Sequence, residues 1–522
     1  MAKAIMIQGT SSHVGKSVLV TALCRIFAQD GYRVAPFKSW NMSLNSSVTL
    51  DGGEIGRSQG EQAEAAGIEA TVHMNPILVK PQGRGQSQVI VQGRVHGAVD
   101  YGTRSDDNYL RFCLGVISDS LAILKSEYDI IVIEGAGSPA EINLMSQDVA
   151  NMKVAHLAEA PVLLVSDIER GGALAAVVGT MLLLPERDRE RIAGFIFNKF
   201  RGDKSLLEPG LTAVEKRTGR PVLGVVPSLS VTRPAEEDGV ALEGRSGENK
   251  RDGERLRLCV VRLTHISNFT DLDALAAERD VAMHYVGCVS ELRQADAVII
   301  PGSKNTVLDN RFLSENGFVE EIRRLSARGV PVVGICGGYQ LLGKRLNDPD
   351  GNESGGTPVS LEGLGLLDTE TTFYAQKTVT RVTAIGLLPF AMGEEVEGYE
   401  IHMGQTVRLP GCRPAFRLQK DGREVPDGAV CASGSTWGTY LHGVFDRPCF
   451  RRAWLNSLRR MKGWGELSVD STENIRGARF DELAGHVRQE LKMDEIYNLI
   501  GLAGPKEVQS LGCNSDGSGD FV

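Results

Sequence analysis

The sequence of 522 residues has no apolar run of the ~20 residues that a membrane-spanning helix needs. It also has no basic tail and no run of lysines and arginines, and its formal net charge is -9, which argues against a nucleic-acid-binding protein. The apolar stretch at the start is too short for a signal peptide and runs directly into a glycine-rich turn. These absences predict a cytoplasmic protein with neither a nucleic acid nor a membrane as partner.

The nine cysteines are scattered along the chain, and no two of them form a CxxC pair. We therefore expect neither a disulfide framework nor a zinc site. Most of the cysteines should be small buried hydrophobic residues, and one has a setting of its own that is described below. With 42% hydrophobic and 24% charged residues the composition is that of an ordinary globular protein, and the length predicts two to four domains.

Short apolar runs alternate with helical patterns in two parts of the chain, which predicts an α/β fold with two mainly parallel sheets flanked by helices. We predict a first domain over 1–234, a charged linker over 235–255, a second domain over 256–503 and a disordered tail over 504–522. The expected strands cover 3–9, 32–38, 128–137, 160–168, 192–200 and 221–227 in the first domain, and 256–263, 281–287, 295–303 and 331–338 in the second.

The stretch GTSSHVGKS at 9–17 lies between an apolar strand and a helical pattern. Gly15, Lys16 and Ser17 fit the end of the phosphate-binding loop GxxxxGK[ST], although Gly9 lies one position too far upstream. Backbone N–H groups at the start of the helix can bind phosphate oxygens, Lys16 can reach the β- and γ-phosphates, and Ser17 can ligate Mg²⁺. The alternative is a plain glycine turn with an exposed lysine, but the flanking strand and helix favour an ATP site.

Two charged residues at strand ends support this interpretation. Glu134 ends an apolar strand, where it could hold Mg²⁺ directly or through water, or could merely cap the next turn. Lys38 follows the second strand, where it could provide a second cation for the phosphates. An exposed strand-end lysine explains Lys38 about equally well.

A second glycine-rich turn follows the strand at 331–335. The form G-x-C-x-G, with Cys336 followed by Gly337, is typical of a nucleophile elbow, whose sharp turn exposes the reactive side chain. The start of the following helix can stabilise the thiolate. The N–H of Gly337 can donate to an oxyanion, and the N–H beside Gly302 is a candidate second donor. A buried structural cysteine is the alternative, which the glycines on both sides disfavour.

A cysteine nucleophile also needs a general base. His442 follows a β-like run and a glycine, which is a suitable loop position for this role. His265, His284 and His402 are alternatives by position in the chain.

Both halves of the sequence resemble known families. The loop has the form G-T-x-x-x-V-G-K-[ST] of the dethiobiotin synthetase-like ATPases, which implies a P-loop NTPase-like first domain. The second half resembles the class I glutamine amidotransferases, which implies a flavodoxin-like second domain. In this order the two halves resemble the cobyric acid synthase family of cobalamin biosynthesis. The matching stretches are NMSLNS, MNPILVKPQG, EGAGSPAEINL, DIERGG, NKFRGD, HISNFTDLDAL, PGSKNT, GICGGYQ, GYEIHMG and GTYLHGVFD.

This resemblance implies an ATP- and glutamine-dependent, carbon–nitrogen bond-forming ligase. The family amidates the b, d, e and g carboxylates of adenosylcobyrinic acid a,c-diamide, with Mg²⁺ and ATP forming acyl phosphates that ammonia then attacks. Cys336 would release that ammonia from glutamine through a thioester, and His442 would move the protons.

The resemblance also assigns residues to the nucleotide. By position in the family pattern, Thr10, His13 and Gly15 line the phosphate loop, and Asn198 contacts the adenine. A turn residue at a strand end is the alternative for Asn198.

One position departs from the class I pattern, which usually has a glutamate two residues after the catalytic histidine. Val444 stands there. Asp446 or Glu400 could orient His442 instead, and a cysteine–histidine dyad without a third residue is also possible.

Other functions can be weighed against this one. A cobyrinic acid a,c-diamide synthase would have the same two domains, but HISNFTDLDAL and NMSLNS favour the cobyric acid synthase family. A partitioning-type ATPase would have a lysine early in the loop, where the chain has Thr10, Ser11 and Ser12. An α/β-hydrolase with a cysteine nucleophile leaves the phosphate loop without a role. The oligomeric state stays open, a homo-oligomer included.

Overall fold

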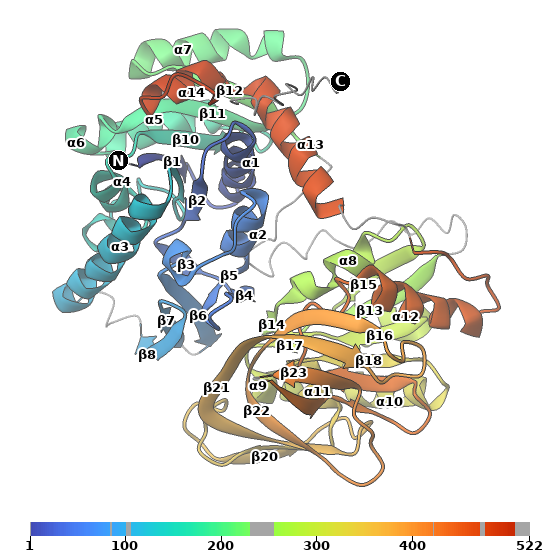
Figure 1. Ribbon diagram of the computed structural model, residues 1–522. Helices are drawn as coiled ribbons and strands as arrows, with labels where there is room; N and C mark the ends of the chain where they lie inside the picture. Colours follow the sequence, from blue (N-terminus) through green and yellow to red (C-terminus); the bar gives the residue numbers. More distant parts are fainter. Residues whose placement is uncertain are drawn as a thin grey trace, which may run out of the picture.

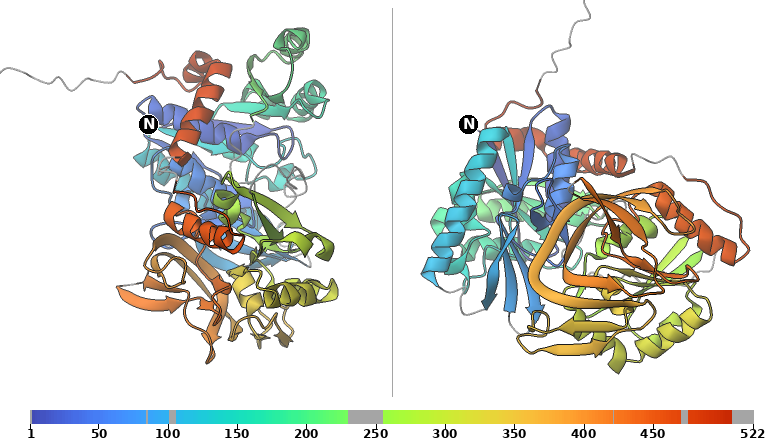
Figure 2. Two further views of the ribbon diagram at one scale, coloured as in Figure 1. Left: turned by 90° about the vertical axis from the view of Figure 1, so that its right-hand side faces the viewer. Right: turned by 60° about the horizontal axis from the view of Figure 1, so that its bottom comes forward.

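The computed structural model describes residues 2–83, 86–100, 106–229, 255–420, 422–469 and 475–506. Apart from residue 255 and residues 504–506, the predicted linker and the predicted tail lie outside the described residues. Two domains lie side by side, with the amino-terminal strands in one and the strands after residue 255 in the other (Figures 1 and 2).

The first domain is built on a parallel sheet of six strands, and all six coincide with strands that the apolar runs predict. Their order is β12 (Val222–Pro227), β11 (Ile192–Phe200), β10 (Val162–Asp167), β1 (Lys3–Gly9), β9 (Ile130–Glu134) and β2 (Val34–Phe37). The central strands are buried along almost their whole length, which explains their nearly continuous Val, Ile and Leu content. The helices of this domain are α1 (Lys16–Gln29), α2 (Arg57–Ala65), α3 (Asp107–Glu127), α4 (Met152–Ala158), α5 (Ala173–Leu183), α6 (Glu186–Arg189) and α7 (Glu208–Thr218).

Two smaller sheets, which the sequence did not predict, extend the first domain toward the second (Figure 1). One has the order β3 (Trp40–Met42), β6 (Ile77–Gly83), β7 (Gln86–Val91) and β8 (Arg94–Asp100). The other pairs β4 (Ser46–Val48) with β5 (Glu54–Gly56).

The second domain has its own mainly parallel sheet, as predicted. The order is β15 (Val281–Val286), β13 (Leu256–Val261), β16 (Ala297–Ile300), β18 (Val332–Ile335), β26 (Thr436–Thr439) and β25 (Ala429–Val430), of which only β25 is antiparallel to its neighbour. Its helices include α8 (Asp273–Ala276), α9 (Thr306–Glu315), α10 (Phe318–Ala327), the short α11 (Gly337–Leu342) and α12 (Pro448–Met461), with a 3-10 turn η6 (Phe269–Leu272).

A second, largely antiparallel sheet follows in the chain and was not predicted. It contains β19 (Arg345–Asp348), β20 (Val359–Glu362), β21 (Thr369–Gly386), β22 (Glu395–Arg408), β23 (Phe416–Lys420) and β24 (Arg423–Asp427). Its long hairpin β21–β22 curves around the domain and reaches the first one (Figure 2). The nitrogen Nε of Arg381 on β21 donates to the carbonyl of Val48 at 2.8 Å.

The predicted end of the second domain is wrong. Helices α13 (Ile475–Glu490) and α14 (Met493–Leu499) lie on the first domain, next to α1 (Figure 1). Leu483 and Val487 join the apolar core formed by α1, and Arg488 pairs with Asp30 at 2.9 Å. The apolar side chains of these helices cover α1. The chain therefore returns to the first domain after it has completed the second, which the order of segments in the sequence does not reveal.

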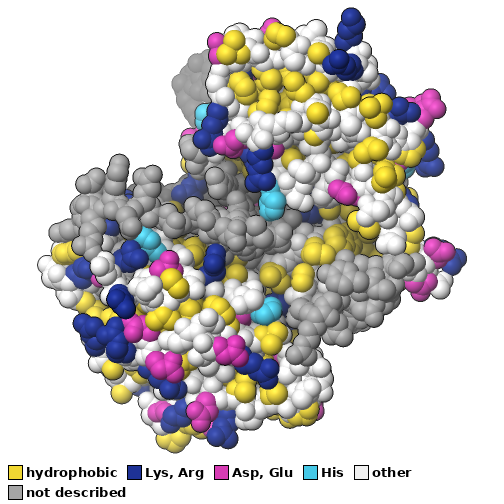
Figure 3. Space-filling model, turned by 180° about the vertical axis from the view of Figure 1, so that it is seen from behind, with side chains coloured by type: hydrophobic (Ala, Val, Ile, Leu, Met, Phe, Trp, Pro, Cys, Tyr) yellow, Lys and Arg dark blue, Asp and Glu magenta, His cyan; other side chains and the backbone are white. Residues whose placement is uncertain are grey.

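Among the described helices, none combines the length and the apolar character needed to cross a membrane. On the face shown in Figure 3, Lys and Arg side chains are interspersed with Asp and Glu over the second domain.

Candidate active sites

The phosphate-loop motif forms a tight turn between β1 and α1, as predicted. Gly15 precedes α1 with a φ of 98°, in the left-handed region. The conformation favours glycine, and a Cβ atom there would lie 2.1 Å from Nδ2 of Asn198 and would displace that amide. His13 has a φ of 59°, and its carbonyl accepts a hydrogen bond from Nζ of Lys199 at 2.6 Å. The bond from Lys199 and the left-handed residues His13 and Gly15 together define the shape of the turn.

Charged and polar side chains meet at the carboxyl ends of β1, β2 and β9. The Ser17 hydroxyl donates to Oε1 of Glu134 at 2.9 Å, and Nζ of Lys38 lies 2.9 Å from the same oxygen. Nε2 of Gln62 donates to the other carboxylate oxygen at 2.6 Å. Burial alone would raise the pKa of Glu134, but the Lys38 ammonium and these hydrogen bonds hold it below its ordinary value. The carboxylate is thus kept ionised.

Ser17 and Glu134 are suited to a magnesium ion because both present oxygen ligands, which Mg²⁺ prefers. In the described part of the chain, no group of three or more His, Cys, Asp or Glu side chains could hold a metal by itself. Phosphate oxygens and water would have to supply the other ligands. Lys16 lies beside this pair, and its Nζ donates to the carbonyls of Ser11 and Gly137.

Two further residues assigned to the nucleotide lie at the same edge of the sheet. The Thr10 hydroxyl is 3.0 Å from that of Ser166. Nδ2 of Asn198 donates to the carbonyl of Val14 at 2.8 Å, so its amide supports the loop, and its contact with adenine stays a prediction. Lys199, which was not predicted, pairs with Asp167 at 2.9 Å and holds the loop from the other side.

Cys336 lies at a sharp turn between β18 and α11, as the elbow motif predicts. Its φ is 51°, which is rare for a residue with a side chain and is typical of a nucleophile elbow. A Cβ atom at Gly337 would lie 2.6 Å from the nitrogen of Ser303, and one at Gly338 would lie 1.9 Å from the carbonyl of Ile300. Both positions therefore require glycine.

His442 is the histidine that faces Cys336. His442 is 2% exposed and Cys336 is 7% exposed. The Cys336 side chain is among the groups that raise the pKa of His442. Nδ1 of His442 is 2.7 Å from Oδ2 of Asp271, and the other oxygen of Asp271 accepts from the N–H of Gly443 at 3.0 Å. Burial alone would lower the pKa of His442, but Asp271 and Cys336 raise it to about 10. The three side chains form a cysteine–histidine–aspartate arrangement.

Gly302 lies at the same place. A Cβ atom built on it would be 3.6 Å from Cε1 of His442. Gly302 and Gly337 therefore both border the thiol site, and their role as oxyanion donors stays a prediction.

The three alternative histidines have other partners. His265 pairs with Asp309, and His284 lies 3.3 Å from an Arg257 nitrogen. The ring of His402 stacks on a tyrosine and its Nδ1 lies 2.8 Å from a backbone carbonyl.

Comparisons with known proteins cover nearly the whole chain. Residues 5–240 match the CobQ/CobB/MinD/ParA nucleotide binding domain, and residues 257–450 match the CobB/CobQ-like glutamine amidotransferase domain. The cobyric acid synthase of Pelotomaculum thermopropionicum is 51% identical over 97% of this chain and 98% of its own length. The chain belongs to the cobyric acid synthase family. Relatives of the same name from Desulforamulus reducens and Salmonella typhi are 48% and 49% identical over 96% of the chain and 99% of their own lengths.

In this member of the cobyric acid synthase family, the residue that orients the histidine was not predicted. Neither Asp446 nor Glu400 does so, because Asp271 occupies that position. Asp271 lies in η6, within the stretch HISNFTDLDAL that carried part of the resemblance. That stretch also contains Asp273, so the sequence provides no basis for choosing between the two carboxylates.

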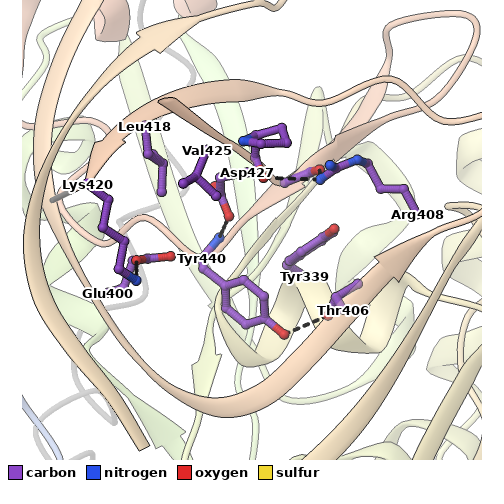
Figure 4. A pocket seen from close by; sticks show the side chains of 11 residues that line it. Tyr339, Glu400, Thr406, Arg408, Leu418, Lys420, Val425, Asp427 and Tyr440 are labelled. Atoms are coloured by element: carbon purple, nitrogen blue, oxygen red, sulfur yellow. Dashed lines mark hydrogen bonds and ion pairs between the residues drawn. The ribbon is translucent and has the colours of Figure 1, made fainter. Parts of the chain in front are cut away.

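Glu400 belongs to a neighbouring pocket of about 120 Å³ in this cobyric acid synthase family member. Figure 4 shows its carboxylate paired with Lys420, at 2.9 Å, and the Tyr440 hydroxyl directed at Thr406. Gln340 connects the pocket to the thiol site, because its backbone N–H donates to the Cys336 carbonyl at 3.1 Å and its Nε2 donates to the Tyr440 hydroxyl at 3.3 Å. The ion pair explains why Glu400 is not available to His442.

Proposed function

We propose that this chain converts adenosylcobyrinic acid a,c-diamide to adenosylcobyric acid by amidating the b, d, e and g carboxylates with ATP and glutamine. The observation that carries the proposal is that one chain, matched along 97% of its length by a relative named cobyric acid synthase, holds both an ATP-type loop and a glutaminase-type triad. The reaction is placed in the cytoplasm, where ATP and glutamine are abundant.

The first domain would activate the carboxylate. A carboxylate is a poor electrophile for ammonia, so transfer of the γ-phosphoryl group of ATP to its oxygen makes an acyl phosphate and releases ADP. Ammonia then attacks the acyl carbon, and phosphate leaves as the amide forms. Lys16 and the loop N–H groups stabilise negative charge on the transferring phosphoryl group. A Mg²⁺ held by Ser17 and Glu134 would neutralise phosphate charge there.

The second domain would produce the ammonia. The Cys336 thiolate attacks the side-chain amide carbon of glutamine, and the oxyanion lies near the N–H groups of Gly337 and Gly302. Protonated His442 donates its proton to the leaving nitrogen, so ammonia departs and a thioester remains. His442 then takes a proton from the water that hydrolyses the thioester to glutamate. Asp271 holds the ring so that Nε2 is the nitrogen that exchanges protons.

The test is the mass of the product. The purified full chain, given ATP, Mg²⁺, glutamine and the a,c-diamide, should yield the species with four added amides and about one ADP for each amide. Reactions without ATP are the control. Conversion of cobyrinic acid into its diamide, with no reaction of the a,c-diamide, would contradict the proposal and identify the protein as a cobyrinic acid a,c-diamide synthase.

A further inference from the structure

Three buried groups from the two domains close a ring of hydrogen bonds. The Tyr399 hydroxyl donates to the carbonyl of Ser46 at 3.1 Å, and Nδ2 of Asn268 donates to that hydroxyl at 3.2 Å. The N–H of Ser46 donates to Oδ1 of Asn268 at 3.3 Å and completes the ring. Ser46 is on β4 of the first domain, whereas Asn268 and Tyr399 belong to the second. The ring therefore joins the domains at one defined point.

Both second-domain members of the ring also hold the glutaminase residues. The ring of Tyr399 stacks on that of His442 with 5.1 Å between centroids, and the backbones of the two residues exchange two hydrogen bonds. Asn268 directly precedes η6, the turn that carries Asp271. Asn268 has a φ of 51°, in the left-handed region that asparagine adopts more readily than most residues, and its amide is bonded to Ser46 and Tyr399.

The first-domain side of the ring is connected to the nucleotide site through a short segment. Lys38 pairs with Glu134, and Ser46 follows eight positions later. The Ser46 hydroxyl donates to Glu54 at 2.8 Å, and Glu54 also pairs with Lys377 of β21 in the second domain at 2.5 Å. The segment is thus bonded at one end to the predicted Mg²⁺ carboxylate and at the other to the amidotransferase domain.

Helix α2 makes a second connection between the same two places. Gln62, in its last turns, donates to the Glu134 carboxylate at 2.6 Å. The backbone N–H of Arg57, its first residue, donates to the carbonyl of Asn45, the neighbour of Ser46, at 3.1 Å. Burial alone would lower the pKa of Arg57, but neighbours that include Tyr399 and Asp271 raise it instead. Helix α2 therefore connects the Glu134 carboxylate to the segment that carries Ser46.

We propose that Tyr399 and Asn268 are positioning residues through which the first domain sets the orientation of His442, so that glutamine hydrolysis responds to ATP and corrinoid acid bound to the first domain. Ligands at the loop rearrange the contacts of Glu134 and Lys38, and the Ser46 ring transmits the change to η6 and to the His442 stack. This inference rests on the proposed function, since it presumes that His442 serves glutamine hydrolysis.

The test compares glutamate release by the full chain with and without ATP, Mg²⁺ and the a,c-diamide. Tyr399→Phe keeps the ring on His442 and removes only the hydroxyl. Asn268→Gly removes the amide and tolerates the positive φ. We expect each variant to lower the stimulation of glutamate release by about 5-fold or more, the range of an ordinary coupling free energy. The loss should be in kcat rather than in KM for glutamine, because the glutamine contacts are unchanged.

Two controls separate a coupling role from a structural one. Tyr374→Phe removes a hydroxyl from an exposed tyrosine on the same hairpin and should leave the stimulation unchanged. Amidation driven by ammonium chloride should stay within about 2-fold of wild type in all three variants, because it needs only the first domain. Unchanged stimulation in both Tyr399→Phe and Asn268→Gly would overturn the inference, as would a wild-type glutaminase that ligands do not stimulate. A wild-type chain that forms no amide from ammonia would instead overturn the proposed function.

Discussion

The nucleotide site and the thiol site start from the same local structure. Each places a residue with positive φ between a parallel strand and a helix, Gly15 with φ 98° in the first and Cys336 with φ 51° in the second. The turn at Gly15 presents backbone N–H groups, because glycine has no side chain to obstruct a phosphate. The turn at Cys336 presents the side chain itself, because the strained backbone conformation directs the sulfur away from the strand and the helix.

The sites differ in how their charges are satisfied. At the nucleotide site Glu134 is already paired with Lys38 and bonded to Ser17, so an incoming ligand rearranges existing contacts. At the thiol site Asp271, His442 and Cys336 are buried next to one another. The protein itself therefore supplies both the nucleophile and the base. The same kind of turn thus binds a phosphate anion when its central residue is glycine and holds a thiolate when that residue is cysteine.

Removal of the Cys336 thiol should have the largest effect, and it should affect only the reaction that depends on the thiol site. Cys336→Ala should lower glutamine-driven amidation by about 10⁵–10⁶-fold, as loss of a covalent nucleophile does, and leave ammonia-driven amidation near wild type. Product formation from each nitrogen source measures both. Cys449→Ala, at an exposed cysteine, is the matched control. Loss of the ammonia-driven reaction as well would show that the domain roles are wrongly assigned.

Asp271 tests whether the third residue matters. Asp271→Asn should lower glutamate release by about 10³–10⁴-fold, because an amide facing Nδ1 favours the wrong imidazole tautomer. Asp446→Asn provides the comparison, since the sequence offered Asp446 for the same role. Equal rates of glutamate release by the two variants would contradict a role for Asp271 and would support a cysteine–histidine dyad without a third residue.

Lys16 tests the nucleotide site in the opposite way. Lys16→Ala should lower amidation from both nitrogen sources by about 10²–10³-fold, because the charge on the transferring phosphoryl group loses a preorganised cation. Lys216→Ala on α7, an exposed position, controls for loss of a lysine in this domain. A variant that still uses ammonia at the wild-type rate would contradict the assignment of the loop.

The smallest effect concerns stability and pH. The pKa of His442 is raised from its ordinary value of 6.5 to about 10, so the folded protein binds a proton that the unfolded chain lacks between these values. This stabilisation is complete below about pH 6.5 and is lost as the pH rises through about 10. The thermal midpoint of wild type should therefore approach that of His442→Gln as the pH rises. A gap that stays constant between pH 6.5 and 10 would contradict the raised pKa of His442.

Much of both sites follows from local sequence patterns. All six strands of the first parallel sheet, and β13, β15, β16 and β18 of the second, are predicted from their apolar runs, because a strand buried on both faces excludes polar residues. The loop residues Gly15, Lys16 and Ser17 and the elbow residues Cys336 and Gly337 lie in contiguous motifs, whose spacing alone determines which atoms face the turn.

The sequence by itself therefore determined the two sheets, the two turns and the chemistry that each turn can support, because these depend on residues a few positions apart. Only the tertiary structure decided which carboxylate faces His442, that the last helices cover α1, and that Ser46 meets Asn268 and Tyr399. Such contacts join segments more than 100 positions apart. They depend on how whole elements pack, and no local pattern of apolar or charged residues encodes that choice.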